Sequence, residues 1–261
     1  MPNTDVDARL DTLKQVLNIT FNRNLTTLEK HFPNFYQRYK DYTPKSAGLE
    51  MDGKGFLNIA SNGKFIYDGD PQKICKEQLE AFARTPVRTV YNLNNINPED
   101  APVHFEHIDY IHKIVVTANK ITDGEKGTKY DIPECYPFMC VIGVGMGYHL
   151  EYLANENISH MYIYEPNDDI FYASLFVVDY ANIFSKFTQE NKGITLEVGS
   201  SPEKFSESLH NCLYQRGVFR SAAMPIYRHY NSEKADEALK RFYDNITKYY
   251  SGFGFFEDEL I

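Results

Sequence analysis

Apolar side chains recur at three- and four-residue steps near the start of the chain. The positions are Leu25, Leu28, Phe32, Phe35 and Tyr39. This spacing places them on one face of a helix, so we predict helix over roughly residues 5–40. We expect a break near Asn22–Asn24, and Pro33 either kinks the helix or ends its first part.

Two β-prone runs flank Asn62 and Gly63 within residues 55–68. An Asn-Gly pair tolerates the positive φ angles of a type I′ turn, so this segment is predicted to form a β-hairpin. Pro71 then precedes a stretch with helical character over residues 72–84. Because proline is favoured at the first position of a helix, we predict a helix there.

The middle of the chain is less regular. Residues 91–103 are rich in Asn and Pro and are predicted to form a loop. Residues 105–118 have helical spacing, although the Ile-Val-Val run at 114–116 also suits a strand, and we favour the helix. Gly, Asp, Lys and Pro over residues 122–136 mark a second loop. We therefore expect a helical N-terminal region over residues 1–125 and an α/β domain over 126–261.

The pattern after this boundary alternates between short apolar runs and amphipathic stretches. The predicted strands are 138–143, 160–165 and 193–198, with 224–227 as one further strand. The predicted helices are 147–157, 168–186 with a break at Asp179, 202–216 and 232–249. Strands separated by helices of this length imply right-handed crossovers and a parallel sheet. The predicted fold class is α/β: a Rossmann-like, mostly parallel sheet with flanking helices, preceded by a helical region with a β-hairpin.

Charge and composition exclude several classes of protein. The formal net charge of -9 opposes nucleic-acid binding, which needs a basic face for phosphates. The N-terminus is polar and acidic, unlike a signal peptide, and no run reaches the roughly 18 apolar residues of a membrane helix. We expect neither a nucleic-acid nor a membrane partner, a cytoplasmic location, and reduced thiols at the four cysteines.

The most informative segment is a glycine-rich turn between the first and second strands of the α/β part. Gly143, Gly145 and Gly147 form this glycine loop (residues 143–147), and Glu165 ends the next strand. In Rossmann-type sheets such glycines let backbone approach a nucleotide, and the acid accepts from a ribose hydroxyl. A nucleotide or nucleotide-sugar is thus the candidate ligand. The candidate binding residues are Gly143, Gly145, Gly147, Tyr148, Glu165 and Asn167.

Two interpretations of the glycine loop stay open. Its Gly-x-Gly-x-Gly spacing is nearer to S-adenosylmethionine sites than to dinucleotide sites. Methyltransferases usually carry an acid two residues before the first glycine, where this chain has Val141. The departure weakens the methyltransferase interpretation. The other interpretation is that the glycines only form a tight turn and hold no ligand. For Asp168 and Asp169, which follow Glu165, we favour a structural role in which they stabilise the start of a helix through its dipole.

Other candidate sites are weaker. His104, His107 and His112 lack a Cys or carboxylate at the spacing of a metal motif, so we assign no metal ligands and place them on the polar face of a helix. His149 lies in the first turn after the glycine loop. Its two interpretations are that it faces a bound ligand or that it has a structural role, and we favour the structural role. The sequence shows neither a nucleophile elbow nor a phosphate-loop lysine, and we assign no catalytic residue.

Several of these segments together resemble the motility-associated factor (Maf) glycosyltransferases of flagellated bacteria. The matching stretches include Val141–Leu153, Ile163–Asn167 and Phe171–Leu175. Upstream, Asn24-Leu25, His31–Pro33, Asn58-Ile59, Pro86 and Arg88 also match, and the stretch from Gly252 to Leu260 resembles the linker before that family's central domain. The resemblance runs from about residue 15 to the end of the chain.

This resemblance implies a role in flagellin glycosylation and motility. Family members transfer nonulosonic acids of the pseudaminic or legionaminic type to flagellin Ser or Thr in the cytoplasm. Their central domain, with a Gly-x-Gly-Pro-Ser-Leu motif that this chain lacks, carries the chemistry. We therefore expect an N-terminal accessory module that partners flagellin and a downstream transferase domain. The alternative is a methyltransferase-like enzyme that uses S-adenosylmethionine, or another nucleotide-binding Rossmann enzyme.

Overall fold

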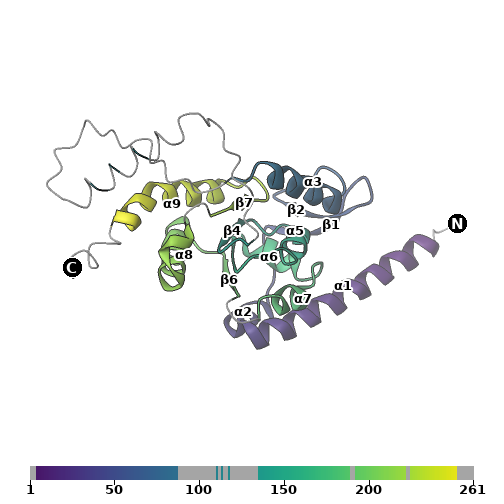
Figure 1. Cartoon of the computed structure of the whole chain (residues 1–261). Coiled ribbons are helices and arrows are strands. Elements are labelled where there is room, and N and C mark those ends of the chain that lie inside the picture. The colour runs from purple at the N-terminus through teal and green to yellow at the C-terminus, as the bar shows by residue number, and fades with distance from the viewer. Residues whose placement is uncertain are drawn as a thin grey trace. The chain divides into compact units, whose positions relative to one another are not determined.

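The computed structural model describes residues 4–87, 135–188, 192–221 and 224–251, and the isolated positions 110, 113 and 117 (Figure 1). The described residues within 4–87 and 135–251 pack as one compact unit. The N-terminal segments therefore pack with the α/β part, and the expected boundary after residue 125 stays a prediction. The predicted loop at 91–103 and the three histidines at 104, 107 and 112 lie outside the described residues. So does the helix predicted at 105–118, except for its three described positions, which are helical.

A four-stranded parallel sheet forms the centre of the first unit. Its strands are β4 (Met139–Ile142), β5 (His160–Glu165), β6 (Gly193–Val198) and β7 (Ile226–Arg228). The order across the sheet is β6-β5-β4-β7, and every neighbouring pair is parallel. The predicted parallel sheet is confirmed, and the extra strand predicted at 224–227 is β7, which spans residues 226–228. Because β5 and β7 pair with opposite edges of β4, the strand order reverses at β4.

Helices cover both faces of this sheet. They are α5 (Tyr148–Leu153), α6 (Asp168–Ser174), α7 (Tyr180–Ser185), α8 (Pro202–Arg216), the 3₁₀ helix η2 (Val218–Ser221) and α9 (Glu233–Ser251). Alternate residues of β4 and β5 point to opposite faces, as strand geometry requires. Val141 and Ile163 pack with α5, α6 and α7, whereas Ile142 and Tyr164 pack with α8 and α9. Asp179 caps α7, which confirms the predicted break there.

The N-terminal segment forms α1 (Thr4–His31) and α2 (Pro33–Tyr39). Helix α1 is a long rod along the α7 side of the sheet (Figure 1). The chain is helical through Asn22–Asn24, so the break predicted there is wrong, and the interruption falls at Phe32, before Pro33. Asn24 is compatible with helix because its side chain is fully buried and bonds to other segments instead of to its own backbone.

Asn24 joins α1 to the segment between α6 and α7. Its Nδ2 donates to the carbonyls of Leu175 and Val178, both at 2.7 Å, and its Oδ1 accepts from the Tyr180 N–H at 3.0 Å. We expect Asn24→Ala to lower the free energy of unfolding by about 2–3 kcal/mol, because three buried backbone groups lose their partners. Urea unfolding measures this. Asn22→Ala, at an exposed position of the same helix, should stay within about 0.5 kcal/mol of wild type.

A small antiparallel sheet follows, made of β1 (Ala47–Met51), β2 (Leu57–Ser61) and β3 (Lys64–Phe65). Asn62 and Gly63 connect β2 and β3 with φ angles of 51° and 75°, as the predicted turn requires. Strand β1 was not predicted. Helix α3 (Pro71–Arg84) confirms the helix predicted at 72–84, and the Asp70 side chain caps its start. None of the described helices combines the length and apolar character needed to cross a bilayer.

Candidate functional site: a closed glycine loop

The glycine loop lies directly after β4, at the carboxyl-terminal edge of the sheet. In open α/β sheets, ligands bind outside this edge, where the strand order reverses. Here the connection from β4 leads to β5 on one side, and β7 lies on the other. The glycine loop predicted from the sequence thus lies at the position where Rossmann-like proteins hold nucleotides. To bind a nucleotide, the loop needs free hydrogen-bond donors and open space above its backbone.

Every backbone N–H of the glycine loop already has an acceptor inside the protein. The Gly143 N–H donates to the Tyr164 carbonyl at 2.8 Å and that of Gly147 to the Val144 carbonyl at 2.8 Å. Val144 donates to Glu165 Oε2 at 2.7 Å, and the Gly145 N–H also bonds to the Glu165 carboxylate. The Met146 N–H donates to the Tyr67 hydroxyl at 2.9 Å. A phosphate would have to displace these internal partners to bind here.

Side chains of the same chain also fill the space over the loop. The three glycines have φ angles of 89°, 51° and 83°. A Cβ on Gly143 would lie 2.7 Å from the Tyr230 ring, and one on Gly147 would lie 2.8 Å from Val178. A Cβ on Gly145 would overlap the Tyr67 hydroxyl and approach His229. The glycines are therefore required by the packing of the protein's own residues, whether or not a ligand binds.

Glu165 is fully buried and faces the loop. Its Oε1 accepts from the Tyr230 hydroxyl at 2.5 Å and from the Asn167 N–H at 2.9 Å, while Oε2 accepts from Val144. Burial raises the pKa of Glu165 to about 7, and these hydrogen bonds only partly offset the rise. Glu165 was predicted to hold a ribose. In this structure its hydrogen bonds connect β5 to the glycine loop and to the segment after β7.

The raised pKa of Glu165 predicts a particular dependence of stability on pH. Because its pKa rises from 4.5 to about 7 on folding, the native state binds the proton more tightly. The contribution of Glu165 to stability is therefore complete below pH 4.5 and is lost as pH rises through 7, by about 3 kcal/mol. Urea unfolding between pH 4.5 and 8 tests this. The difference in free energy of unfolding between wild type and Glu165→Gln should change by that amount across this pH range. A difference that stays constant with pH would contradict the prediction.

The two remaining predicted residues have structural contacts as well. Tyr148, at the start of α5, is half-buried and bonds through its hydroxyl to Gln72 of α3. Asn167 is the N-cap of α6, where its side chain accepts from the Asp169 N–H at 2.9 Å. The structure thus brings the glycines, Glu165 and Asn167 together at one edge of the sheet, whereas Tyr148 faces α3. Their proposed role in binding a nucleotide stays a prediction.

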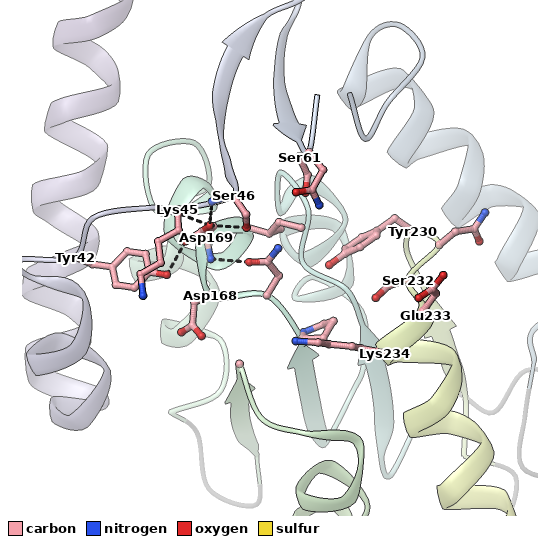
Figure 2. Close-up of a pocket in the computed structure, with 16 residues that line it drawn as sticks. Tyr42, Lys45, Ser46, Ser61, Asp168, Asp169, Tyr230, Ser232, Glu233 and Lys234 are labelled. Atoms are coloured by element: carbon pink, nitrogen blue, oxygen red, sulfur yellow. Dashed lines mark hydrogen bonds between the residues drawn. The ribbon is translucent and has the colours of Figure 1, made fainter. Parts of the chain in front are cut away.

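An open pocket of about 560 Å³ lies beside the closed loop and is called the edge pocket (Figure 2). It is lined by the segments after β5, β6 and β7, by the segment before β1 and by the β2–β3 turn. Its charged lining residues are Lys45, Asp168, Asp169, Glu233 and Lys234. Of the predicted binding residues, only Asn167 lines it. The pocket is polar and carries both signs of charge.

The two aspartates that line the edge pocket have specific partners, which their position at the start of α6 did not predict. Asp168 pairs with Arg38 at 2.5 Å and accepts from the Tyr39 hydroxyl at 2.6 Å. Asp169 accepts from the Tyr42 hydroxyl at 2.6 Å and from the backbone N–H groups of residues 45–47. Figure 2 shows the bonds from Tyr42, Lys45 and Ser46 converging on Asp169. Both acids therefore connect α6 to the N-terminal region.

Cys75 and His229 were not predicted as site residues, but with His149 they form a group of buried side chains behind the glycine loop. Cys75, His149 and His229 come from α3, α5 and the segment after β7, and the two histidine rings stack with centroids 3.9 Å apart. Burial lowers the pKa of His149 well below its usual value and that of His229 to about 3, so both rings are neutral. Residues so distant in sequence form no motif, so no spacing signal pointed to them.

Comparison with known families identifies the chain. Residues 20–251 match the family described as the glycosyltransferase Maf N-terminal domain. The chain belongs to this family. The match covers nearly all of the segment in which the sequence resembled Maf proteins, and that prediction is confirmed. No protein with a curated description matches the chain.

A solved Maf structure has the same fold. It is described as the "Structure of MAf glycosyltransferase from Magnetospirillum magneticum AMB-1", and it matches with a TM-score of 0.59 at 20% sequence identity. The match covers 89% of this chain but 35% of that protein. At this identity the likeness establishes the fold alone. The chain thus spans about a third of the length of the Maf protein that it matches.

Proposed function

We propose that this chain is the N-terminal accessory module of a Maf-type glycosyltransferase. The parent enzyme would transfer nonulosonic sugars of the pseudaminic or legionaminic type to flagellin Ser or Thr in the cytoplasm, during flagellar assembly. Membership of the Maf N-terminal domain family supports the enzyme class. The sugar, the flagellin partner and the downstream transferase domain are parts of the proposal.

One observation supports an accessory role for the module itself. The backbone N–H groups that a Rossmann loop offers to a phosphate are all bonded internally, to Tyr164, Glu165, Tyr67 and Val144. The Rossmann-like part then serves as a rigid scaffold instead of as a nucleotide site. Donor binding and sugar transfer belong to the downstream domain, while this module positions that domain or holds flagellin.

The proposal is tested with the full-length parent protein, flagellin and a cytidine-activated nonulosonic acid. Intact-mass analysis of flagellin should show added nonulosonic acid. Immobilised flagellin should also bind the 261-residue chain in biolayer interferometry. If the parent instead methylates an acceptor in the presence of S-adenosylmethionine, the methyltransferase interpretation holds and the proposal is wrong.

Removing the downstream domain provides the matched control. The 261-residue chain alone should add no sugar to flagellin under the same conditions, because we place the chemistry outside it. Sugar transfer by the chain alone would contradict the accessory role, even if the parent is a flagellin glycosyltransferase.

A further inference from the structure

A second pocket adjoins the edge pocket. It has a volume of about 580 Å³, and Ser61, Ile170, Tyr230 and Asn231 line both pockets. Together the two pockets form a depression between the β2–β3 hairpin and the segment after β7, which we call the hairpin groove. Either pocket alone has the volume of a small-molecule site, so the groove as a whole has room for several residues of a polypeptide.

Three exposed lysines line the hairpin groove, and each comes from a different segment. Lys45 precedes β1, Lys64 begins β3 and Lys234 lies in the first turn of α9. Figure 2 shows Lys45 and Lys234 at the edge pocket. Within the described residues, no carboxylate lies at ion-pair distance from any of the three ammonium groups. These cations are therefore available to a ligand.

Most of the acids that line the hairpin groove are already paired. The paired acids are Asp68, Asp168 and Asp169, whose respective partners are Lys54, Arg38 and the Tyr42 hydroxyl. Glu233 is the lining acid for which the described residues offer no such partner. Three unpaired lysines against one unpaired acid give the groove a positive character, on a chain whose formal net charge is -9. The groove is thus complementary to a ligand that carries carboxylates.

The second pocket adds an apolar surface to this charge pattern. Ile66, Ile74 and Ile170 line it, and the first two are only half-buried. An apolar side chain of a ligand would remove this surface from water, which favours binding. The sugars and phosphates of a nucleic acid would not do so, and the net charge of -9 repels a polymer with a negative charge on every residue.

Hydrogen bonds hold the walls of the hairpin groove in place. The Tyr230 hydroxyl donates to Glu165, and Asp169 accepts from the N–H groups of Lys45 and Ser46 on the segment before β1. The groove is therefore formed before a ligand arrives, which reduces the conformational entropy that binding costs.

We propose that the hairpin groove binds an extended, acidic segment of a protein substrate. Carboxylates of the segment would pair with Lys45, Lys64 and Lys234, and a neighbouring apolar side chain would lie against Ile66 and Ile74. Because the three lysines belong to separate segments, an extended chain with spaced carboxylates suits them better than one compact anion. The inference rests on the proposed function, under which the protein substrate is flagellin.

Biolayer interferometry of the 261-residue chain on immobilised flagellin tests the groove. The double variant Lys45→Glu, Lys234→Glu should bind at least about tenfold more weakly than wild type, because two attractive charges become repulsive. The matched control is Lys30→Glu, Lys204→Glu, which reverses two exposed lysines outside both pockets and changes the net charge equally. It should bind within about twofold of wild type. Equal losses in the two double variants would overturn the proposal, since net charge alone would then explain them.

The apolar part of the groove has a separate test in the same assay. Ile66→Ser should weaken flagellin binding by about fivefold, whereas Ile19→Ser, at an exposed position of α1, should bind as wild type does. Circular dichroism confirms that each variant is folded. Equal affinity of Ile66→Ser and wild type would overturn the placement of an apolar side chain in the second pocket.

The outcomes separate this inference from the proposed function. If every variant binds flagellin as wild type does while the full-length parent still adds sugar to it, the groove assignment is wrong and the proposed function stands. Absence of sugar transfer by the parent would instead count against the proposed function itself. A short single-stranded RNA that binds the wild-type chain more tightly than flagellin does would overturn the choice of a protein segment.

Discussion

Replacing Gly145 by valine is expected to lower the free energy of unfolding by about 3–5 kcal/mol. Gly145 has a φ of 51°, which costs a β-branched residue conformational energy. A Cβ there would also overlap the Tyr67 hydroxyl and lie 2.9 Å from the His229 ring. Both neighbours are buried side chains held by hydrogen bonds, so they have little room to move. Urea unfolding followed by circular dichroism measures the loss.

Gly53→Ala is the matched control for this substitution. Nothing lies within 4 Å of a Cβ built on Gly53, so its stability should stay within about 0.5 kcal/mol of wild type. The informative contrary result is a Gly145→Val protein that melts like wild type but loses affinity for a nucleotide. That result would make the glycine loop a working site instead of a packed turn.

Replacing Asp169 by alanine is expected to lower the free energy of unfolding by about 4 kcal/mol. Its carboxylate accepts from two hydroxyls, at 2.6 Å from Tyr42 and 2.8 Å from Ser46, and from three backbone N–H groups. Removing it leaves all of these donors without their acceptor and frees the segment before β1 from α6. The loss should appear as a lower urea midpoint.

The pKa of Asp169 adds a second test of the same residue. Burial alone would raise this pKa, but hydrogen bonds from Tyr42 and Ser46 outweigh it and lower the value from 3.8 to about 2. The stability that Asp169 contributes is therefore present above pH 3.8 and lost as pH falls through 2. Asp169→Ala should lack this loss, whereas Asp41→Ala, at an exposed acid, should behave as wild type does.

The elements with strong local signals were predictable from the sequence. The Asn62-Gly63 turn needs positive φ angles, and the apolar runs of β4, β5 and β6 are short and bounded by turn residues. Two errors share a physical cause. The helix passes through Asn24 because that side chain bonds to Leu175, Val178 and Tyr180, and strand β1 is stabilised by pairing with β2. Both depend on contacts between distant segments, which local patterns do not report.

The candidate site was predictable in position but not in detail. The spacing of the glycines and Glu165 placed the loop correctly at the end of β4. The residues that close it lie far from it in sequence. Tyr67 lies between β3 and α3, and Tyr230 follows β7. Nothing in their local sequence shows that they face the loop. For the same reason, the sequence did not show that Cys75, His149 and His229 lie together, because they belong to three separate segments.

These contacts support the proposal that the Rossmann-like part of the chain acts as a scaffold. Glu165 and the Tyr67 hydroxyl accept hydrogen bonds from loop N–H groups that would otherwise be free for a phosphate, and Tyr230 packs where a ligand would approach Gly143. The hydrogen-bonding groups of the glycine loop are then satisfied inside the protein. A module of this kind suits the positioning of a catalytic domain or a protein substrate.

The most direct test of this account is calorimetric titration of the chain with S-adenosylmethionine, NAD and cytidine nucleotides. Because the N–H groups of the glycine loop are bonded internally, we predict no saturable heat with any of them. One-to-one binding of a nucleotide to the wild-type chain, lost in a Gly145→Ala variant that unfolds at the wild-type temperature, would contradict the central claim. The loop would then be an open nucleotide site.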